Sequence, residues 1–127
     1  MNYPKVLLVD DERDFVCTLA ERLELRDIKV DIAFNGKEAV QKIEERRPQL
    51  VVLDLLMPEM PGLDVLKWIE KHHPDTEVIV LTGRGAQEST EEAFRLGASD
   101  CLMKPMNIDE LIEKMTKVLK SSESKGR

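Results

Sequence analysis

The sequence has few cysteines, few aromatic side chains and no long apolar run. Only Cys17 and Cys101 among its 127 residues are cysteines, and they follow no metal-binding spacing. We therefore expect two reduced thiols, and neither a disulfide framework nor a zinc site. No apolar run approaches the roughly 20 residues of a membrane helix, and the first residues, MNYPKVLLVD, lack a signal-peptide cleavage site. These absences predict a cytoplasmic protein without membrane contact.

A positive net charge is also absent. The formal net charge of −6 argues against nonspecific nucleic-acid binding, because such binding depends on positive side chains at phosphates. We expect no direct nucleic-acid binding by this domain, while a separate DNA-binding domain in a longer protein stays open. The composition, 42% hydrophobic and 35% charged, is that of a globular chain. We expect one domain at residues 1–120 and a polar tail at 121–127 that is frayed or begins a linker.

Short β-branched apolar runs alternate along the chain with longer amphipathic stretches. The expected strands are Lys5–Asp10, Ile28–Ala33, Leu50–Asp54, Glu77–Thr82 and Ser99–Lys104. The expected helices are Arg13–Leu25, Lys37–Arg47, Leu63–Lys71, Gln87–Leu96 and Ile108–Lys120. This alternation predicts an α/β fold with a parallel sheet covered on both faces. Right-handed crossovers and the short chain favour a doubly wound, flavodoxin-like sheet of five strands in the order 2-1-3-4-5, with five helices.

Polar residues stand where four of these strands end. Asp10 and Asp11 follow the first strand, and Asp54, Thr82 and Lys104 end the third, fourth and fifth. Ligands bind at the carboxyl ends of parallel strands, so we expect these side chains to converge. Close carboxylates repel unless a cation lies among them, and Mg²⁺ prefers such hard oxygen ligands. A carboxylate is also a nucleophile towards phosphorus, and a lysine and a hydroxyl can neutralise phosphoryl oxygens. The set therefore predicts Mg²⁺-dependent phosphoryl transfer.

Each of these residues has a simpler explanation when taken alone. Asp11 at a strand end is often a helix N-cap, Thr82 is a good strand former, and Lys104 alone resembles a solvated surface lysine. The functional interpretation depends on their combination within one fold.

The combination resembles the receiver domain of two-component response regulators. The matching motifs appear in the order and spacing of that family: V-D-D-E at 9–12, D-L-L-M-P-E-M-P-G at 54–62, L-T-G at 81–83, G-A-S-D at 97–100 and K-P at 104–105. The resemblance extends over residues 5–120 and together these motifs are highly specific.

This resemblance implies a role for each acidic residue. Asp54 matches the aspartate that accepts a phosphoryl group from a phosphohistidine on a sensor histidine kinase or a phosphotransfer protein. Asp10 and Asp11 match the acidic pair that holds Mg²⁺, together with Asp54 and the backbone carbonyl of Leu56. The resemblance thus implies a phosphoacceptor that catalyses its own phosphoryl transfer and slow autodephosphorylation, rather than a metabolic enzyme.

The resemblance also implies a conformational switch. Thr82 matches the hydroxyl that turns towards the phosphoryl group, and Lys104 matches the lysine that pairs with it, with a cis bond to Pro105. Phosphorylation is expected to change the surface of the fourth helix, fifth strand and fifth helix, which controls a partner protein, an output domain or a phosphorylation-dependent homodimer. Met103, Met106 and Met115 lie in that part of the chain, Met115 on the inward face of the last helix, and exposed methionines there would suit partner binding.

Two positions bear on how the switch would operate. The family usually has an aromatic residue three positions before the lysine, where this chain has Cys101. A thiol cannot make a large ring rotation, so we expect the loop after Thr82 and the helix from Gln87 to carry more of the change. Leu56 and Arg84 lie beside the acceptor in the family. We expect these two side chains to hinder the attacking water and to slow dephosphorylation.

Three other functions would use the same fold or an aspartate in the same role. A hydrolase with an aspartate nucleophile would need a second aspartate at position 56, which is Leu56. A flavin-binding electron carrier of the same topology would need a Ser/Thr/Gly-rich phosphate loop after the first strand, where this chain has Asp10, Asp11 and Glu12. A phosphate-independent interaction module stays open because of Cys101.

Overall fold

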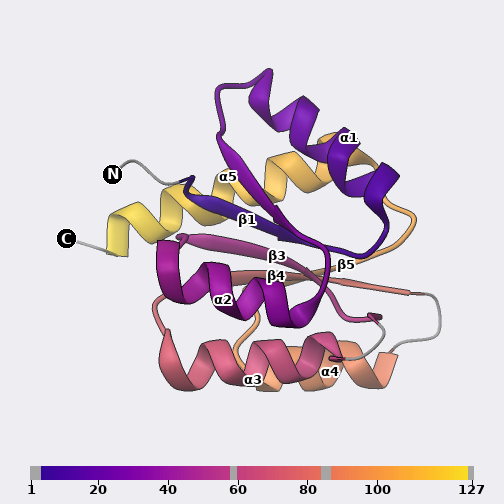
Figure 1. The fold of residues 1–127 in the computed structure, drawn as a ribbon, viewed down its shortest axis with the longest axis vertical. Helices are drawn as coiled ribbons and strands as arrows, with labels where there is room; N and C mark the ends of the chain where they lie inside the picture. The colour runs from indigo at the N-terminus through magenta and orange to yellow at the C-terminus, as the bar shows by residue number, and fades with distance from the viewer. Residues whose placement is uncertain (1–3, 58–59, 84–86, 126–127) are drawn as a thin grey trace.

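A computed structural model describes residues 4–57, 60–83 and 87–125 (Figure 1). The strands are β1 (Val6–Val9), β2 (Val30–Ala33), β3 (Leu50–Asp54), β4 (Glu77–Thr82) and β5 (Asp100–Met103). The helices are α1 (Arg13–Glu24), α2 (Gly36–Arg46), α3 (Gly62–His72), α4 (Gln87–Arg95) and α5 (Ile108–Lys125). The strands form one parallel sheet in the order β2-β1-β3-β4-β5, which confirms the predicted fold class and topology.

The helices cover the sheet on both faces. Figure 1 shows α1 and α5 on one side of the sheet and α2, α3 and α4 on the other. Alternate residues of the central strands belong to separate cores: Leu53 packs towards α2 and α3, and its neighbour Val52 packs towards α1 and α5. Because both faces are covered, β1 and β3 are apolar throughout, except where β3 ends at Asp54.

Local sequence explains where α2 begins. The side chain of Asn35 accepts a hydrogen bond from the amide of Glu38 at 2.8 Å, so Asn35 is the N-cap and the helix starts at Gly36. The helix therefore begins one residue before the predicted start at Lys37. At the other end, Arg47 adopts a left-handed conformation, with φ of 47°, and terminates it.

The last helix is longer than the sequence pattern predicted. We expected a frayed tail after Lys120, but α5 continues through Lys125. Residues 121–125 contain no glycine or proline, and Gly126 comes next. Without a helix breaker, each added residue gains a backbone hydrogen bond, so propagation continues although the apolar periodicity has ended.

Among the residues that the structure describes, no helix is long and apolar enough to span a membrane.

Candidate functional site

Three polar side chains are buried at the carboxyl ends of the central strands. Asp10 follows β1, Asp54 ends β3 and Thr82 ends β4, and their exposed fractions are 1%, 3% and 4%. The sheet register places Val9 opposite Leu53 and Asp54 opposite Leu81, so these strands end together. The predicted convergence of polar residues at one edge of the sheet is therefore present.

Lys104 connects the acidic residues of this edge. Its Nζ lies 2.6 Å from Oδ2 of Asp10, 2.9 Å from Oε1 of Glu12 and 3.5 Å from Oδ2 of Asp54. The ammonium also lies 4.7 Å from the centre of the Phe15 ring, within the range of a cation–π interaction. The peptide bond from Lys104 to Pro105 is cis, as the resemblance implied. These contacts make Lys104 the cation that balances the buried carboxylates.

Asp54 is held by the backbone on one oxygen and by charge on the other. Its Oδ1 accepts a hydrogen bond from the amide of Leu56 at 3.0 Å, while Oδ2 faces Lys104. Burial, with a smaller contribution from the charge of Asp10, raises the pKa of Asp54 to about 6, against the lowering effects of the Leu56 amide and Lys104. Because burial disfavours its ionised form, the site favours a cation beside this carboxylate.

Glu12 belongs to this site although the sequence analysis gave it no role. It is the N-cap residue of α1, yet its side chain does not cap the helix and contacts Lys104 instead. Its amide donates to Oδ1 of Asp10 at 2.9 Å, which ties the helix start to β1. Carboxylate oxygens of Asp10, Glu12 and Asp54 lie within 4.8 Å of one another, close enough to share a metal ion.

The remaining predicted metal ligands lie at the margin of this group. Asp11 is exposed and is not one of the three clustered acids. Its neighbours Asp10 and Glu12 both contact Lys104. The side chain of Leu56 is 64% exposed.

Thr82 is buried but its hydroxyl is used within the sheet. It donates a hydrogen bond of 3.4 Å to the carbonyl of Leu102 in β5. The next residue, Gly83, is close to Leu56, since a Cβ built there would lie 2.9 Å from Leu56 Cδ1. The structure thus links the end of β4 both to β5 and to the loop after Asp54. Arg84, predicted to lie beside the acceptor, is outside the described residues.

The sequence matches the family model of the response regulator receiver domain over residues 6–116. This chain belongs to that family. It is therefore a regulatory phosphoacceptor switch of a two-component system, a class that works with histidine kinases and output domains.

Individual relatives agree with this assignment. The chain is 42% identical over 120 residues to the transcriptional regulatory protein CpxR homolog of Haemophilus influenzae, covering 94% of this chain but 52% of that protein. It thus spans about half the length of that relative. It is 36% identical to the chemotaxis protein CheY of Thermotoga maritima, covering 98% of that protein and 91% of this chain. A CheY-like receiver domain of Methanospirillum hungatei superposes with a TM-score of 0.92 at 29% identity, covering 98% of this chain and 99% of that one.

The receiver domain has a partly buried thiol at the position of the family's usual aromatic residue. Cys101 packs against the core on the side of α2, α3 and α4. Burial, with a smaller contribution from the charge of Asp100, raises the pKa of the Cys101 thiol to about 11. The side chain is therefore a neutral packing group near pH 7.

The predicted methionine surface is only partly present. Met103 is 56% exposed and Met106 is partly buried, but Met115 has no exposed surface. Met115 lies on the inward face of α5 together with Leu111 and Ile112, as its helical spacing predicted, so it is not available for partner binding. Phe94 of α4, which is 50% exposed, contributes apolar surface that the sequence analysis did not assign.

Proposed function

We propose that Asp54 of this receiver domain takes the phosphoryl group from a phosphohistidine of a sensor histidine kinase or phosphotransfer protein. The observation that carries the proposal is the arrangement around Lys104, whose ammonium touches Asp10 and Asp54 at the same edge of the sheet. An aspartate fixed by a backbone amide on one oxygen and facing a cation with the other is placed to react at its second oxygen.

In the proposed transfer, the phosphorus–nitrogen bond of phosphohistidine breaks and a bond forms from phosphorus to a carboxylate oxygen of Asp54. The products are an acyl phosphate and a neutral imidazole, which takes its proton from solvent. Lys104 neutralises charge on one phosphoryl oxygen. The hydroxyl of Thr82 gives up its hydrogen bond to the carbonyl of Leu102 and donates a hydrogen bond to a second phosphoryl oxygen. These three residues form the proposed catalytic set.

Mg²⁺ is the proposed cofactor, and the donor set fits it. Asp10 and Asp54 are buried acids beside Glu12, and carboxylate oxygens are ligands that Mg²⁺ prefers. When bound, Mg²⁺ would supply positive charge to the transferring phosphoryl group. Asp11 and the Leu56 carbonyl stay proposed ligands from the family resemblance; an exposed Asp11 side chain would have to turn towards the site.

The proposed output passes from Thr82 to β5. When the Thr82 hydroxyl moves, its hydrogen bond to the carbonyl of Leu102, the neighbour of Cys101, breaks. The conformational change therefore extends to the surface of α4, β5 and α5 without the rotation of an aromatic ring. Exposed Phe94 and Met103 on this surface would contact a target protein, an output domain or a second phosphorylated copy. The family match over residues 6–116 supports a receiver unit at 1–120, with 121–127 leading to a linker. We place this reaction in the cytoplasm.

Autodephosphorylation is proposed to be slow. Leu56 lies against Gly83, beside the acceptor loop, where its apolar side chain would obstruct an attacking water. The half-life of the acyl phosphate should therefore exceed that of a Leu56→Asn, Arg84→Ala variant. Equal half-lives would contradict this proposal.

Incubation with Mg²⁺ and acetyl phosphate, followed by intact mass measurement, tests the main proposal. A single phosphoryl adduct is expected on the wild type and none on Asp54→Asn. An equal adduct on Asp54→Asn, or no adduct on the wild type, would contradict the proposal. An Asp64→Asn variant, which changes an exposed aspartate of α3, is the matched control and should be labelled like the wild type.

A further inference from the structure

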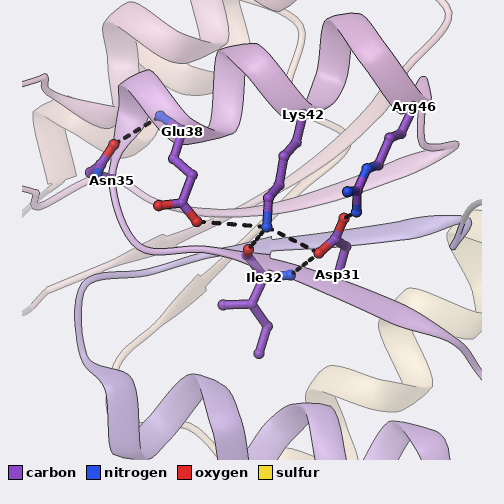
Figure 2. Close-up of polar contacts among 6 residues, drawn as sticks. All are labelled: Asp31, Ile32, Asn35, Glu38, Lys42 and Arg46. Atoms are coloured by element: carbon purple, nitrogen blue, oxygen red, sulfur yellow. Dashed lines mark hydrogen bonds and ion pairs between the residues drawn. The ribbon is translucent and has the colours of Figure 1, made fainter.

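The edge strand β2 has a polar cluster that the phosphoryl site does not use. Figure 2 shows Asp31 of β2 facing Lys42 and Arg46 of α2. Oδ1 of Asp31 accepts a hydrogen bond from the amide of Ile32 at 2.9 Å and lies 3.1 Å from Nζ of Lys42, while Oδ2 pairs with Arg46. Nζ of Lys42 also donates to the carbonyl of Ile32. Both backbone groups of Ile32 are therefore occupied by side-chain atoms.

These two backbone groups face the open edge of the sheet. The amide of Asp10 donates to the carbonyl of Ala33 at 3.1 Å, so Ala33 points its backbone towards β1. Successive residues of a strand point their amides and carbonyls to opposite sides, so Ile32 points away from β1. Among the residues that the structure describes, no strand lies beyond β2 in the sheet order. Ile32 would thus be a ready partner for an added strand if its backbone groups were free.

The opposite edge repeats the arrangement. Lys104 donates its amide to the carbonyl of Thr82 at 2.7 Å, so Cys101, three residues earlier, points its amide away from β4. That amide donates to Oδ1 of Asp100 at 2.8 Å, and Oδ2 of Asp100 pairs with Lys114 of α5 at 3.1 Å. At both edges an aspartate binds the outward amide of the next residue. At both edges, too, a lysine from the helix that follows the strand forms an ion pair with that aspartate.

The carboxylate of Asp31 stays ionised at neutral pH. Partial burial works to raise the pKa of Asp31, but the hydrogen bonds from Lys42 and Ile32 and the charges of Lys42 and Arg46 outweigh it and lower the pKa. Asp31 thus stays an acceptor under physiological conditions.

We propose that Asp31 and Asp100 close the two edges of the sheet against strand addition by a second copy of this chain. Copies of this chain then cannot lengthen the sheet by pairing their edge strands, and must meet one another through side-chain contacts. A simpler explanation is that the two aspartates only fasten α2 and α5 to the sheet. The two explanations predict different results for a variant. If the aspartates only hold the helices on the sheet, their replacement lowers stability; if they block the sheet edges, their replacement causes self-association.

The test compares two double variants. Asp31→Val with Asp100→Val removes both acceptors and leaves strand-forming side chains, while Asp31→Asn with Asp100→Asn keeps an acceptor oxygen at each position. All arms carry Asp54→Asn, so that phosphorylation-dependent association and a failure of the proposed function cannot affect the result. Light scattering after size exclusion measures the mass over a wide concentration range. Hydrogen exchange of the Ile32 and Cys101 amides locates any new pairing.

The valine variant should reach at least twice the monomer mass with slowed exchange at these amides, and the asparagine variant should stay monomeric. A matched control, Asp14→Val with Asp75→Val, makes the same charge change at exposed positions away from the edges and should also stay monomeric. A valine variant that stays monomeric at every concentration would overturn the proposal, as would equal association of the asparagine variant or the control. If the valine variant does not fold, the alanine pair at 31 and 100 replaces it under the same criteria.

Discussion

The Lys104 ammonium lies 2.6 Å from a carboxylate oxygen of Asp10, a residue 94 positions earlier in the chain. Asp10 is almost fully buried, and the lysine side chain is 16% exposed. The same ammonium lies 3.5 Å from Asp54. One lysine thus balances two buried acids, and a metal ion or phosphoryl group that enters the site must share it.

Replacement of Lys104 should destabilise the metal-free protein. In Lys104→Met the carboxylates of Asp10 and Asp54 lose their cation, so the free energy of unfolding should fall by roughly 2–4 kcal/mol at about pH 7. Urea unfolding with EDTA measures it. Lys114→Met, which breaks a more exposed pair with Asp100, is the control and should cost about 1 kcal/mol or less. Equal losses would contradict the role assigned to Lys104.

The raised pKa of Asp54 predicts how stability depends on pH. The folded protein holds this proton up to about pH 6, whereas the unfolded chain releases it near about pH 4. Folding therefore takes up a proton between these values, and the free energy of unfolding falls as pH rises through them. Asp54→Asn removes this effect. In metal-free buffer the free energy of unfolding of the variant should be higher than that of the wild type by roughly 1–3 kcal/mol at about pH 7. Below about pH 4 the two values should differ little. A gain independent of pH would refute the assignment.

Two glycines near the site should respond differently to alanine. A Cβ at Gly62 would lie 2.5 Å from the backbone carbonyl oxygen of Asp54 and 2.5 Å from Cα of Leu55, and neither backbone atom can move away easily. Gly62→Ala should therefore lower the free energy of unfolding by roughly 1–3 kcal/mol. At Gly83 the nearest atom is the end of the exposed Leu56 side chain, so Gly83→Ala should be within about 1 kcal/mol of the wild type. Urea unfolding compares them; a larger loss at Gly83 would reverse the argument.

The two cysteines should differ in reactivity. With a pKa of about 11, only roughly a thousandth of Cys101 is thiolate at about pH 8, and the thiolate is the reactive form. Cys17 is exposed on α1. Iodoacetamide should therefore alkylate Cys17 at least about tenfold faster. Intact mass measurements on Cys17→Ser and Cys101→Ser give the separate rates. Similar rates in the two variants would show that Cys101 is less buried than described.

Much of the fold and part of the site followed from sequence patterns alone. Apolar runs such as Leu50–Asp54 and amphipathic stretches between them predicted the strands, helices and sheet order. Because parallel strands end at a common edge, the positions of Asp10, Asp54 and Lys104 at strand ends predicted that they would meet. These inferences succeeded because periodicity and connection rules depend on backbone geometry that the whole chain shares.

The tertiary structure decided which atoms face one another. The sequence paired Asp10 with Asp11 as metal ligands, yet it is Asp10 and Glu12 that contact Lys104 and cluster with Asp54. Likewise the sequence placed Thr82 at a strand end, but only packing against β5 directs its hydroxyl to Leu102. Side-chain direction at these positions depends on the backbone angles where strand meets helix and on neighbours distant in the chain. The sequence by itself therefore determined the sheet, its order and the edge at which the acids meet, whereas the contacts that place charge at that edge, and those that close the edges at Asp31 and Asp100, arise only when the helices pack on the sheet.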